Sequence, residues 1–174
     1  CGSGTIPIEA ALIAKNRAPG LERSFAAQKW KTMPGTLWLD AAEEAMDKEF
    51  HGSYDIWGGD IDPAAVELSR HNATLAGVED CVRFEVADAG KFHRESAYGQ
   101  LVTNPPYGER LLEKTEAEAL YRRFGAAART LPPGWRVVVL SSHTEFERAF
   151  GRPADKKRKL YNGMLKCDAF LYGR

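Results

Sequence analysis

Apolar and polar positions along the chain follow two alternating patterns. In the longer stretches apolar residues recur every three or four positions, which is typical of helices packed on one face; in the shorter ones they run together, as in buried strands. Helices alternating with strands predict an α/β fold with a mostly parallel sheet, and the Asn162-Gly163 pair predicts an antiparallel hairpin near the C-terminal end. The expected helices cover residues 6–15, 38–50, 63–76, 117–131 and 144–150, and the expected strands cover residues 54–59, 82–86, 100–103, 136–140, 157–161 and 165–172.

The segment from residue 18 to residue 35 interrupts this alternation. It contains two Pro-Gly pairs and is interpreted as irregular, with Phe25 and Trp30 expected to pack it as a loop or short helix onto the core. No internal repeat, low-complexity segment or second domain is visible, and a length of 174 residues predicts one domain.

Composition and charge exclude several classes of protein. With 24 Lys+Arg against 24 Asp+Glu and 44% apolar residues, the chain has the profile of an ordinary globular domain and not of a disordered one. No apolar run approaches the roughly 20 residues of a membrane-spanning helix, and no signal peptide is visible. The three cysteines, Cys1, Cys81 and Cys167, form no CxxC pair, so we expect a cytoplasmic setting with no disulfide framework and no metal site.

Residues 1–5 place a glycine turn immediately before the first expected helix. Gly2 and Gly4 would let the backbone approach a ligand closely, and the helix start offers unpaired N–H groups to a phosphate, a carboxylate or a nucleoside. The turn matches neither the GxGxxG fingerprint nor a phosphate-binding loop with its lysine. Taken alone, an ordinary glycine loop is as good an interpretation.

Two acidic residues follow expected strands. Asp60 ends the first of them, where an acid of a Rossmann-like sheet can accept both ribose hydroxyl hydrogens, while Asp62 is better interpreted as a helix cap. Asp88 follows the next strand, where a carboxylate could accept a hydrogen bond from an adenine amino group. For Asp60 and Asp88 the alternative is a capping or turn aspartate.

The sequence Asn104-Pro105-Pro106-Tyr107, directly after an expected strand, is the most specific signal. The two prolines stiffen the backbone and remove N–H donors, so the Asn104 side-chain oxygen and nearby carbonyls remain as fixed acceptors. Such acceptors suit an amine conjugated to a ring, because accepting its hydrogens favours a pyramidal nitrogen whose lone pair can attack an electrophilic carbon. Tyr107 can stack on that ring, whereas Asn104 can orient and stabilise but cannot act as a strong base. The alternative is a rigid turn without a ligand.

These signals all fall at the carboxyl ends of expected strands, in the crevice where open α/β sheets bind ligands. Together they predict a site for S-adenosylmethionine beside a site for an acceptor amine. The sulfonium of that cofactor makes its methyl carbon electrophilic, so the protein mainly has to position two reactants.

A run of basic residues near the C-terminal end is a candidate contact for nucleic-acid phosphates. A solvated charge run on an edge strand is an equal alternative, because lysine also deters edge-to-edge aggregation. The candidate RNA-binding residues are Lys156, Lys157, Arg158 and Lys159.

Three stretches of the sequence resemble one known family. CGSGTIPIEA at residues 1–10 resembles the end of its DPFCGSGT cofactor motif, TNPPYGER at residues 103–110 resembles its catalytic motif, and RKLYNG at residues 158–163 is similar to its bacterial branch. The family is the THUMP-linked RNA guanine-N2 methyltransferases, in particular the branch that acts on 23S ribosomal RNA. The resemblance spans essentially the whole chain, although NPPY alone also occurs in adenine-N6 and protein-glutamine methyltransferases.

The resemblance implies a Rossmann-like, S-adenosylmethionine-dependent methyltransferase fold that methylates the exocyclic N2 of a guanine, in ribosomal RNA or alternatively in transfer RNA. By position, the methionine portion of the cofactor would be lined by Cys1, Gly2, Gly4 and Thr5, and its ribose would be held by Asp60. The adenine would be met by Ile61, Asp88 and Ala89. The guanine would be received by Asn104, Pro105, Pro106 and Tyr107, and Asn104 would also border the cofactor.

The same resemblance implies that residues 1–174 are a catalytic domain without the family's upstream RNA-binding THUMP region and without its first strand. In a doubly wound sheet that strand would lie between the expected strands over residues 54–59 and 100–103, so the isolated chain is expected to be aggregation-prone or partly unfolded. Two rival functions stay open: a DNA adenine-N6 or protein-glutamine methyltransferase, and an inactive fragment that binds nucleotide or RNA.

Overall fold

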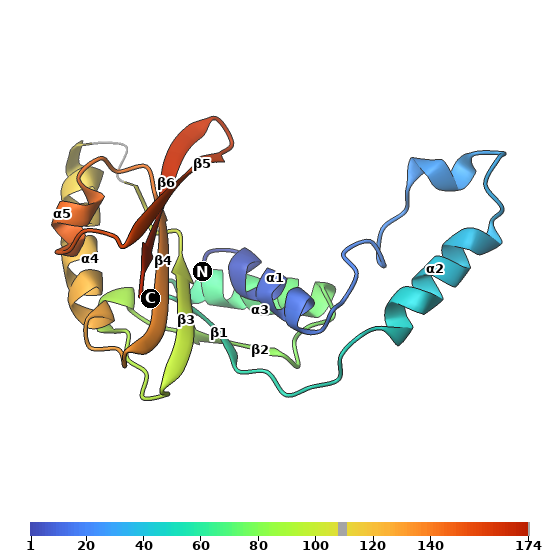
Figure 1. The fold of residues 1–174 in the computed structure, drawn as a ribbon, viewed down its shortest axis with the longest axis horizontal. Helices are drawn as coiled ribbons and strands as arrows, with labels where there is room; N and C mark the ends of the chain where they lie inside the picture. The colour runs from blue at the N-terminus through green and yellow to red at the C-terminus, as the bar shows by residue number, and fades with distance from the viewer. Residues whose placement is uncertain (108–110, 174) are drawn as a thin grey trace.

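The computed structural model describes residues 1–107 and 111–173, and only the backbone of residues 111–113. Within these residues the strands form two sheets (Figure 1). One sheet pairs β1 (Ile56–Asp60) in parallel with β2 (Val82–Val86). The other has the order β3-β4-β6-β5, in which β3 and β4 are parallel and the other pairs are antiparallel. Its strands are β3 (Tyr98–Thr103), β4 (Gly134–Ser141), β5 (Lys156–Asn162) and β6 (Leu165–Tyr172).

Helices occupy the connections between the parallel strands, as the alternating pattern predicts. α3 joins β1 to β2 and α4 joins β3 to β4, so the predicted α/β fold is confirmed. The helices are α1 (Thr5–Ala14), α2 (Thr36–Asp47), α3 (Pro63–Leu75), α4 (Leu111–Ala128) and α5 (Phe146–Phe150), with short 3-10 turns η1 (Ala26–Lys29) and η2 (Ala89–Lys91). No helix in the described part of the chain has the length and apolar character needed to cross a bilayer.

Two apolar clusters hold the helices against the sheets. The first joins α4 and α5 to β4 and β6, and its largest fully buried members are Tyr121, Phe146 and Phe150. The second joins α1 and α3 to β2, with Ala11 and Val66 almost completely buried. In the first cluster α4 uses the face that the spacing of apolar residues predicts, which includes Ala117, Tyr121 and Phe124.

Local signals fix the ends of two elements. Asp62 Oδ1 accepts a hydrogen bond from the Ala64 N–H at 2.9 Å, which confirms Asp62 as the cap of α3. The predicted hairpin is also confirmed, but its turn lies at residues 163–164, one position later than predicted, because Asn162 still pairs with Leu165.

Residues 15–50 form an arm that carries α2 away from the sheets (Figure 1). None of the residues of α2 is buried. The Phe25 ring stacks on Trp38 within the arm, with 5.4 Å between ring centroids, and Trp30 is 60% exposed. The prediction that Phe25 and Trp30 pack this segment onto the core is therefore wrong, because Phe25 contacts a ring of the arm itself and Trp30 stays in solvent.

The two sheets are not joined by a strand pairing within the described residues. β1 pairs with β2 and β3 pairs with β4, which leaves one edge of β1 and one edge of β3 without a described partner. Val102 of β3 is 45% exposed. Because central strands of parallel sheets are normally covered on both faces, the sheet is open at this position.

Candidate active site

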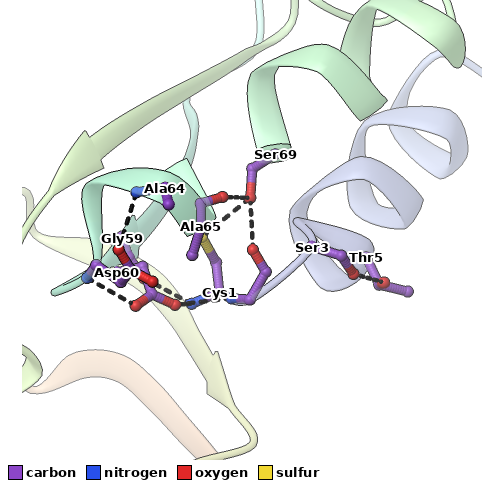
Figure 2. A network of polar contacts seen from close by, with 10 residues as sticks. Cys1, Ser3, Thr5, Gly59, Asp60, Ala64, Ala65 and Ser69 are labelled. Carbon is purple, nitrogen blue, oxygen red and sulfur yellow. Dashed lines mark hydrogen bonds and ion pairs between the residues drawn. The ribbon is translucent and has the colours of Figure 1, made fainter. Parts of the chain in front are cut away.

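The glycine turn closes onto the carboxyl end of β1 (Figure 2). Asp60, the last residue of β1, accepts a hydrogen bond from the Gly2 N–H through Oδ2 at 2.7 Å. The Cys1 nitrogen donates to the same oxygen at 2.7 Å and to the Gly59 carbonyl at 2.8 Å. The turn and Asp60, which the sequence suggested separately, are thus in direct contact.

Asp60 is ionised at neutral pH. Partial burial opposes its charge, but hydrogen bonds from the Cys1 nitrogen and from the amides of Gly2 and Asp62 outweigh burial and lower the pKa of Asp60 below its ordinary value. Its Oδ1 accepts the Asp62 amide at 3.1 Å, and the side chain is 21% exposed. A carboxylate offers about four acceptor sites and three are occupied here, so Asp60 retains about one site for a ribose hydroxyl.

α3 braces the glycine turn from the other side. Ser69 is fully buried, and its Oγ lies 3.0 Å from the Gly2 carbonyl oxygen and 2.8 Å from the Ala65 carbonyl oxygen, so the hydroxyl can donate to either (Figure 2). Asn72 Nδ2 donates to the Ser3 carbonyl at 2.9 Å. We did not predict these braces from the sequence, although a serine on the apolar face of a helix is a signal that a buried partner exists.

The turn requires glycine at position 4. Gly4 has φ +80°, and a Cβ built on it would lie 2.9 Å from Ser69 Cβ. Both the left-handed backbone and the close approach of α3 exclude a larger residue there. At Gly2, by contrast, a Cβ would meet no atom within 4 Å, so open space borders the turn.

Asp88 and Ile61, the residues suggested to meet the adenine, lie just beyond β2 and β1. Asp88 Oδ1 accepts the Gly90 N–H at 2.8 Å and so caps η2, and its Oδ2 lies 3.8 Å from Arg123 Nη1. These contacts account for an aspartate at this position, so the adenine contact stays a prediction. Ile61 is 68% exposed, and its side chain is available to a ring bound beside β1.

The acceptor loop, residues 104–107, follows β3 and is fixed at both ends by tyrosine hydroxyls. The Tyr107 hydroxyl donates to Asn104 Oδ1. The Tyr121 hydroxyl, from α4, donates to the Pro106 carbonyl at 2.6 Å. Asn104 is exposed while Tyr107 is half-buried.

Tyr107 also contacts the hairpin formed by β5 and β6. Asn162 Nδ2 donates to the Tyr107 hydroxyl at 3.4 Å, and Cys167 Sγ lies 3.8 Å from it. Burial is the main cause that raises the pKa of Tyr107 above its ordinary value, so the phenol keeps its proton. The hydroxyl that caps Asn104 is therefore a neutral donor with other partners close by.

The structure joins the predicted site residues in two separate hydrogen-bonded units, one at the end of β1 and one after β3, and these strands belong to different sheets within the described residues. Cys1, Gly2 and Asp60 form one hydrogen-bonded unit, and Asn104 and Tyr107 form another. Asp88 and Ala89 lie at the end of β2, beside Arg123 of α4. The last three residues of the predicted catalytic motif, Gly108, Glu109 and Arg110, lie outside the described residues.

The basic run forms most of β5, and every residue of that strand is exposed. Lys157 Nζ is bound to Glu147 at 2.7 Å, an ion pair to α5. Within the described chain, Lys156, Arg158 and Lys159 form no such pair. Three of the four candidate RNA-binding side chains are thus available to an external anion.

The chain matches the family model of the RMKL-like methyltransferase domain over residues 1–170. Among curated relatives, YpsC of Bacillus subtilis (strain 168), whose name describes a candidate RNA methyltransferase, is 43% identical over 99% of this chain. The ribosomal RNA large subunit methyltransferase K/L of Shewanella baltica (strain OS185) is 40% identical over 99% of this chain. The chain spans 45% of the length of the first relative and 25% of the second.

Three solved structures share the fold at high identity. A candidate methylase from Clostridium difficile 630 has 46% identity and a TM-score of 0.96, over 99% of this chain and 46% of its own. A predicted N6-adenine-specific DNA methylase from Listeria monocytogenes str. 4b F2365 has 44% identity and a TM-score of 0.93, over 100% of this chain and 45% of its own. A candidate methyltransferase complexed with SAH has 42% identity and a TM-score of 0.94, over 100% of this chain and 46% of its own.

These matches extend over the glycine turn, Asp60 and the acceptor loop together, and one matched structure holds SAH. The predicted methyltransferase fold is confirmed, and so is the predicted S-adenosylmethionine cofactor at the level of the family. The chain belongs to the RMKL-like methyltransferase domain family.

Proposed function

We propose that this chain is the catalytic domain of an S-adenosylmethionine-dependent RNA methyltransferase that methylates the exocyclic N2 of a guanine, in large-subunit ribosomal RNA. The observation that carries the proposal is the acceptor loop at the carboxyl end of β3, in a chain whose glycine turn is bound to an ionised Asp60. The names of two curated relatives, which describe RNA methyltransferases, support RNA as the class of substrate.

The glycine turn, Asp60 and their neighbours fit the proposed cofactor. Open space borders Gly2, where the methionine portion would lie, and the Asp60 carboxylate is partly exposed to receive the ribose. Ile61 offers an exposed apolar side chain to the adenine. When bound, S-adenosylmethionine supplies a methyl carbon made electrophilic by the adjacent sulfonium.

The acceptor loop prepares the amine for attack. Asn104 Oδ1 and the loop carbonyls accept the N–H hydrogens of the guanine amino group, which weakens conjugation of its lone pair with the ring. Tyr107 stacks on that ring and fixes its orientation. The proton that the amine loses goes to solvent, because Asn104 is an amide and not a base.

The Tyr107 hydroxyl has to leave Asn104 before an amine binds there. In this structure it donates to Asn104 Oδ1, which is the acceptor that the mechanism assigns to the substrate. The nearby Asn162 and Cys167 side chains give the hydroxyl other partners on the hairpin. Rotation of Tyr107 toward the hairpin would free Asn104 and leave the ring beside the base.

The identity of the product tests the proposal. The complete protein is incubated with S-adenosylmethionine and rRNA, and the nucleosides are analysed by mass spectrometry. We expect N2-methylguanosine as the product of the proposed reaction. The target base must leave its stack to reach the acceptor loop at the sheet edge, so we expect the modified guanine to be formed in accessible RNA. A sample containing only N6-methyladenosine would assign the protein to the rival class.

That rival, an adenine-N6 DNA methyltransferase, is the second candidate function. It is favoured by the description of the Listeria monocytogenes structure, and the acceptor loop would hold an adenine amine in the same way. Parallel reactions with double-stranded DNA separate the two candidates, since the proposed enzyme transfers methyl to RNA and leaves the DNA unmodified.

Binding of RNA is proposed to use the exposed basic face of β5. Replacing Lys156, Arg158 and Lys159 with glutamine is expected to weaken RNA binding and to lower the slope of log K against log salt by roughly one unit for each phosphate that the variant no longer neutralises. Lys157→Gln is the matched control, because Lys157 is already paired with Glu147 and should change the slope little. Titrations at several salt concentrations measure the slope. An unchanged slope in the triple variant would show that these basic residues form a solvated edge strand and do not contact RNA phosphates.

We also propose that the chain acts within a longer polypeptide in the cytoplasm, with an upstream strand between β1 and β3 and an upstream THUMP region that binds RNA. The open sheet edges support the strand, since unpaired central edges are unfavourable. The Cys1 nitrogen bonds to Gly59 of β1, so a strand that enters the glycine turn would arrive beside β1.

A further inference from the structure

Tyr121 connects the hydrophobic core to the acceptor loop. It lies in the middle of α4, is fully buried, and donates its hydroxyl hydrogen to the Pro106 carbonyl at 2.6 Å. The two prolines of the loop have no N–H groups, and the loop belongs to no helix or strand. A side-chain bond to a loop carbonyl is therefore a principal restraint on its position.

The packing of Tyr121 does not by itself explain a hydroxyl at this position. Its ring makes edge contacts with Phe146, at 4.9 Å between centroids, and with His143, at 5.6 Å, and phenylalanine would make the same contacts. A buried hydroxyl without a partner is unfavourable. Burial raises the pKa of Tyr121, so the phenol stays protonated and remains a donor to Pro106.

A series of polar groups also contacts the Tyr121 hydroxyl, in addition to the Pro106 carbonyl. Ser141, at the end of β4, has its Oγ 3.5 Å from the Tyr121 hydroxyl and accepts the His143 N–H at 3.1 Å. Since Tyr121 donates to Pro106, the Ser141 hydroxyl is left to donate to Tyr121. Ser141 and His143 are both buried. The His143 N–H donates to Ser141, the Ser141 hydroxyl donates to Tyr121, and the Tyr121 hydroxyl donates to the loop.

The imidazole of His143 anchors the far end of this series. Its Nδ1 accepts the Glu145 N–H at 3.1 Å, which assigns the ring proton of the neutral imidazole to Nε2. Nε2 lies 3.5 Å from Glu118 Oε1 of α4. Burial is the main cause that lowers the pKa of His143, so the ring is neutral, and the hydrogen bond from Glu145 to Nδ1 restrains its orientation.

We propose that Tyr121, supported by Ser141 and His143, is a positioning residue that fixes the acceptor loop for methyl transfer; this rests on the proposed function of the loop. Tyr121 bonds to the loop backbone and acts on the reaction through Asn104, two residues before the carbonyl that it holds. Small displacements of a positioned reactant slow a reaction strongly, whereas they affect binding at a separate cofactor site little.

Tyr121→Phe in the complete protein tests this role, since it removes one oxygen and keeps the ring. The kcat of methyl transfer is expected to fall about 5–30-fold, the loss of one hydrogen bond that orients the loop. The KM for RNA and the Kd for SAH should each change by less than about twofold. Tyr172→Phe is the matched control, because Tyr172 is buried in the same core cluster and its hydroxyl lies 3.5 Å from the Arg152 carbonyl. The kcat of this variant should equal that of the wild-type protein.

Hydrogen exchange gives a readout that does not depend on activity. In Tyr121→Phe the amides of Thr103, Asn104 and Tyr107 should exchange faster than in wild type, and in Tyr172→Phe they should not. Faster exchange at these amides, with exchange in β6 unchanged, supports the proposal even when the acceptor base has not been found.

Two results would overturn the proposal. One is an unchanged kcat and unchanged exchange in Tyr121→Phe; the other is a fall in kcat accompanied by a loss of SAH affinity of the same fold, which indicates general destabilisation. The guanine assignment is read separately from the nucleoside formed by wild type. If wild type methylates another amine, the guanine proposal fails while the ratio of variant to wild-type kcat on that amine still decides the role of Tyr121.

Discussion

Replacing Asn104 with alanine is expected to lower the kcat of methyl transfer about 10²–10³-fold, the effect of losing one preorganised polar group at the reacting atom. The amide oxygen of Asn104 is the acceptor that keeps the amine lone pair out of the ring system. Alanine removes that acceptor and leaves the prolines and the Tyr121 bond to Pro106 in place. The affinity for S-adenosylmethionine, measured by calorimetry, should change little, because Asp60 and the glycine turn are untouched.

Two further variants distinguish the loss of an acceptor from damage to the loop. Asn104→Asp keeps an acceptor oxygen and should retain more activity than alanine. Asn162→Ala is the matched control: it removes a carboxamide that also contacts Tyr107, at 3.4 Å, but offers no acceptor to the amine, so its kcat should fall much less than that of Asn104→Ala. Near-normal kcat in Asn104→Ala would rule out the proposed role of the loop.

The sequence is sufficient to predict features that depend on neighbours in the chain. Asp62 before Pro63 signals a helix start, and the cap is observed. Asp60 and Asn104 are recognisable because polar residues at the end of apolar strands stand out. Because parallel strands end at one edge of a sheet, the sequence predicts that such residues share a single crevice, and this stays a prediction since β1 and β3 lie in different sheets of the described chain.

Features that depend on long-range packing could not be predicted in this way. Phe25 and Trp30 have the composition of core residues, yet the arm offers Phe25 a partner ring in Trp38 and leaves Trp30 in solvent. In the sequence, Ser69 and Tyr121 stand out only as residues on the apolar faces of expected helices, with nothing to identify their partners. Their hydroxyls have partners 67 and 15 positions away in the chain, distances at which no spacing rule identifies a contact.

The unpaired edges of β1 and β3 show that strand order is also not predictable from local sequence. Apolar runs predict that both stretches are strands, and both are. The order of the strands depends on pairing across the whole sheet. In the described chain one edge of β1 and one edge of β3 have no paired strand. Only a doubly wound order, taken from a family resemblance, predicts where the interruption falls.

The carboxylate of Asp60 gives the second large expected effect. Asp60→Ala should weaken binding of S-adenosylmethionine by about 1–3 kcal/mol, because the ribose hydroxyls lose a charged acceptor. The same change removes the partner of the Gly2 N–H, so the glycine turn also loses a restraint. Ser69→Ala separates these contributions: it loosens the turn at the Gly2 carbonyl and leaves the carboxylate, so it should weaken binding less than Asp60→Ala.

The pH dependence of Asp60 and a cofactor analogue complete this test. The hydrogen bonds to Asp60 lower its pKa below the ordinary value of 3.8, so its contribution to folding is present above pH about 4 and is lost as the pH falls through the lowered pKa. Asp60→Asn should therefore remove this acid dependence of stability. For an SAH analogue without ribose hydroxyls, Asp60→Ala should cost much less affinity than for SAH itself. Calorimetry that finds equal losses for both ligands, or no loss for SAH, would show that Asp60 does not bind the ribose and serves only to hold the glycine turn.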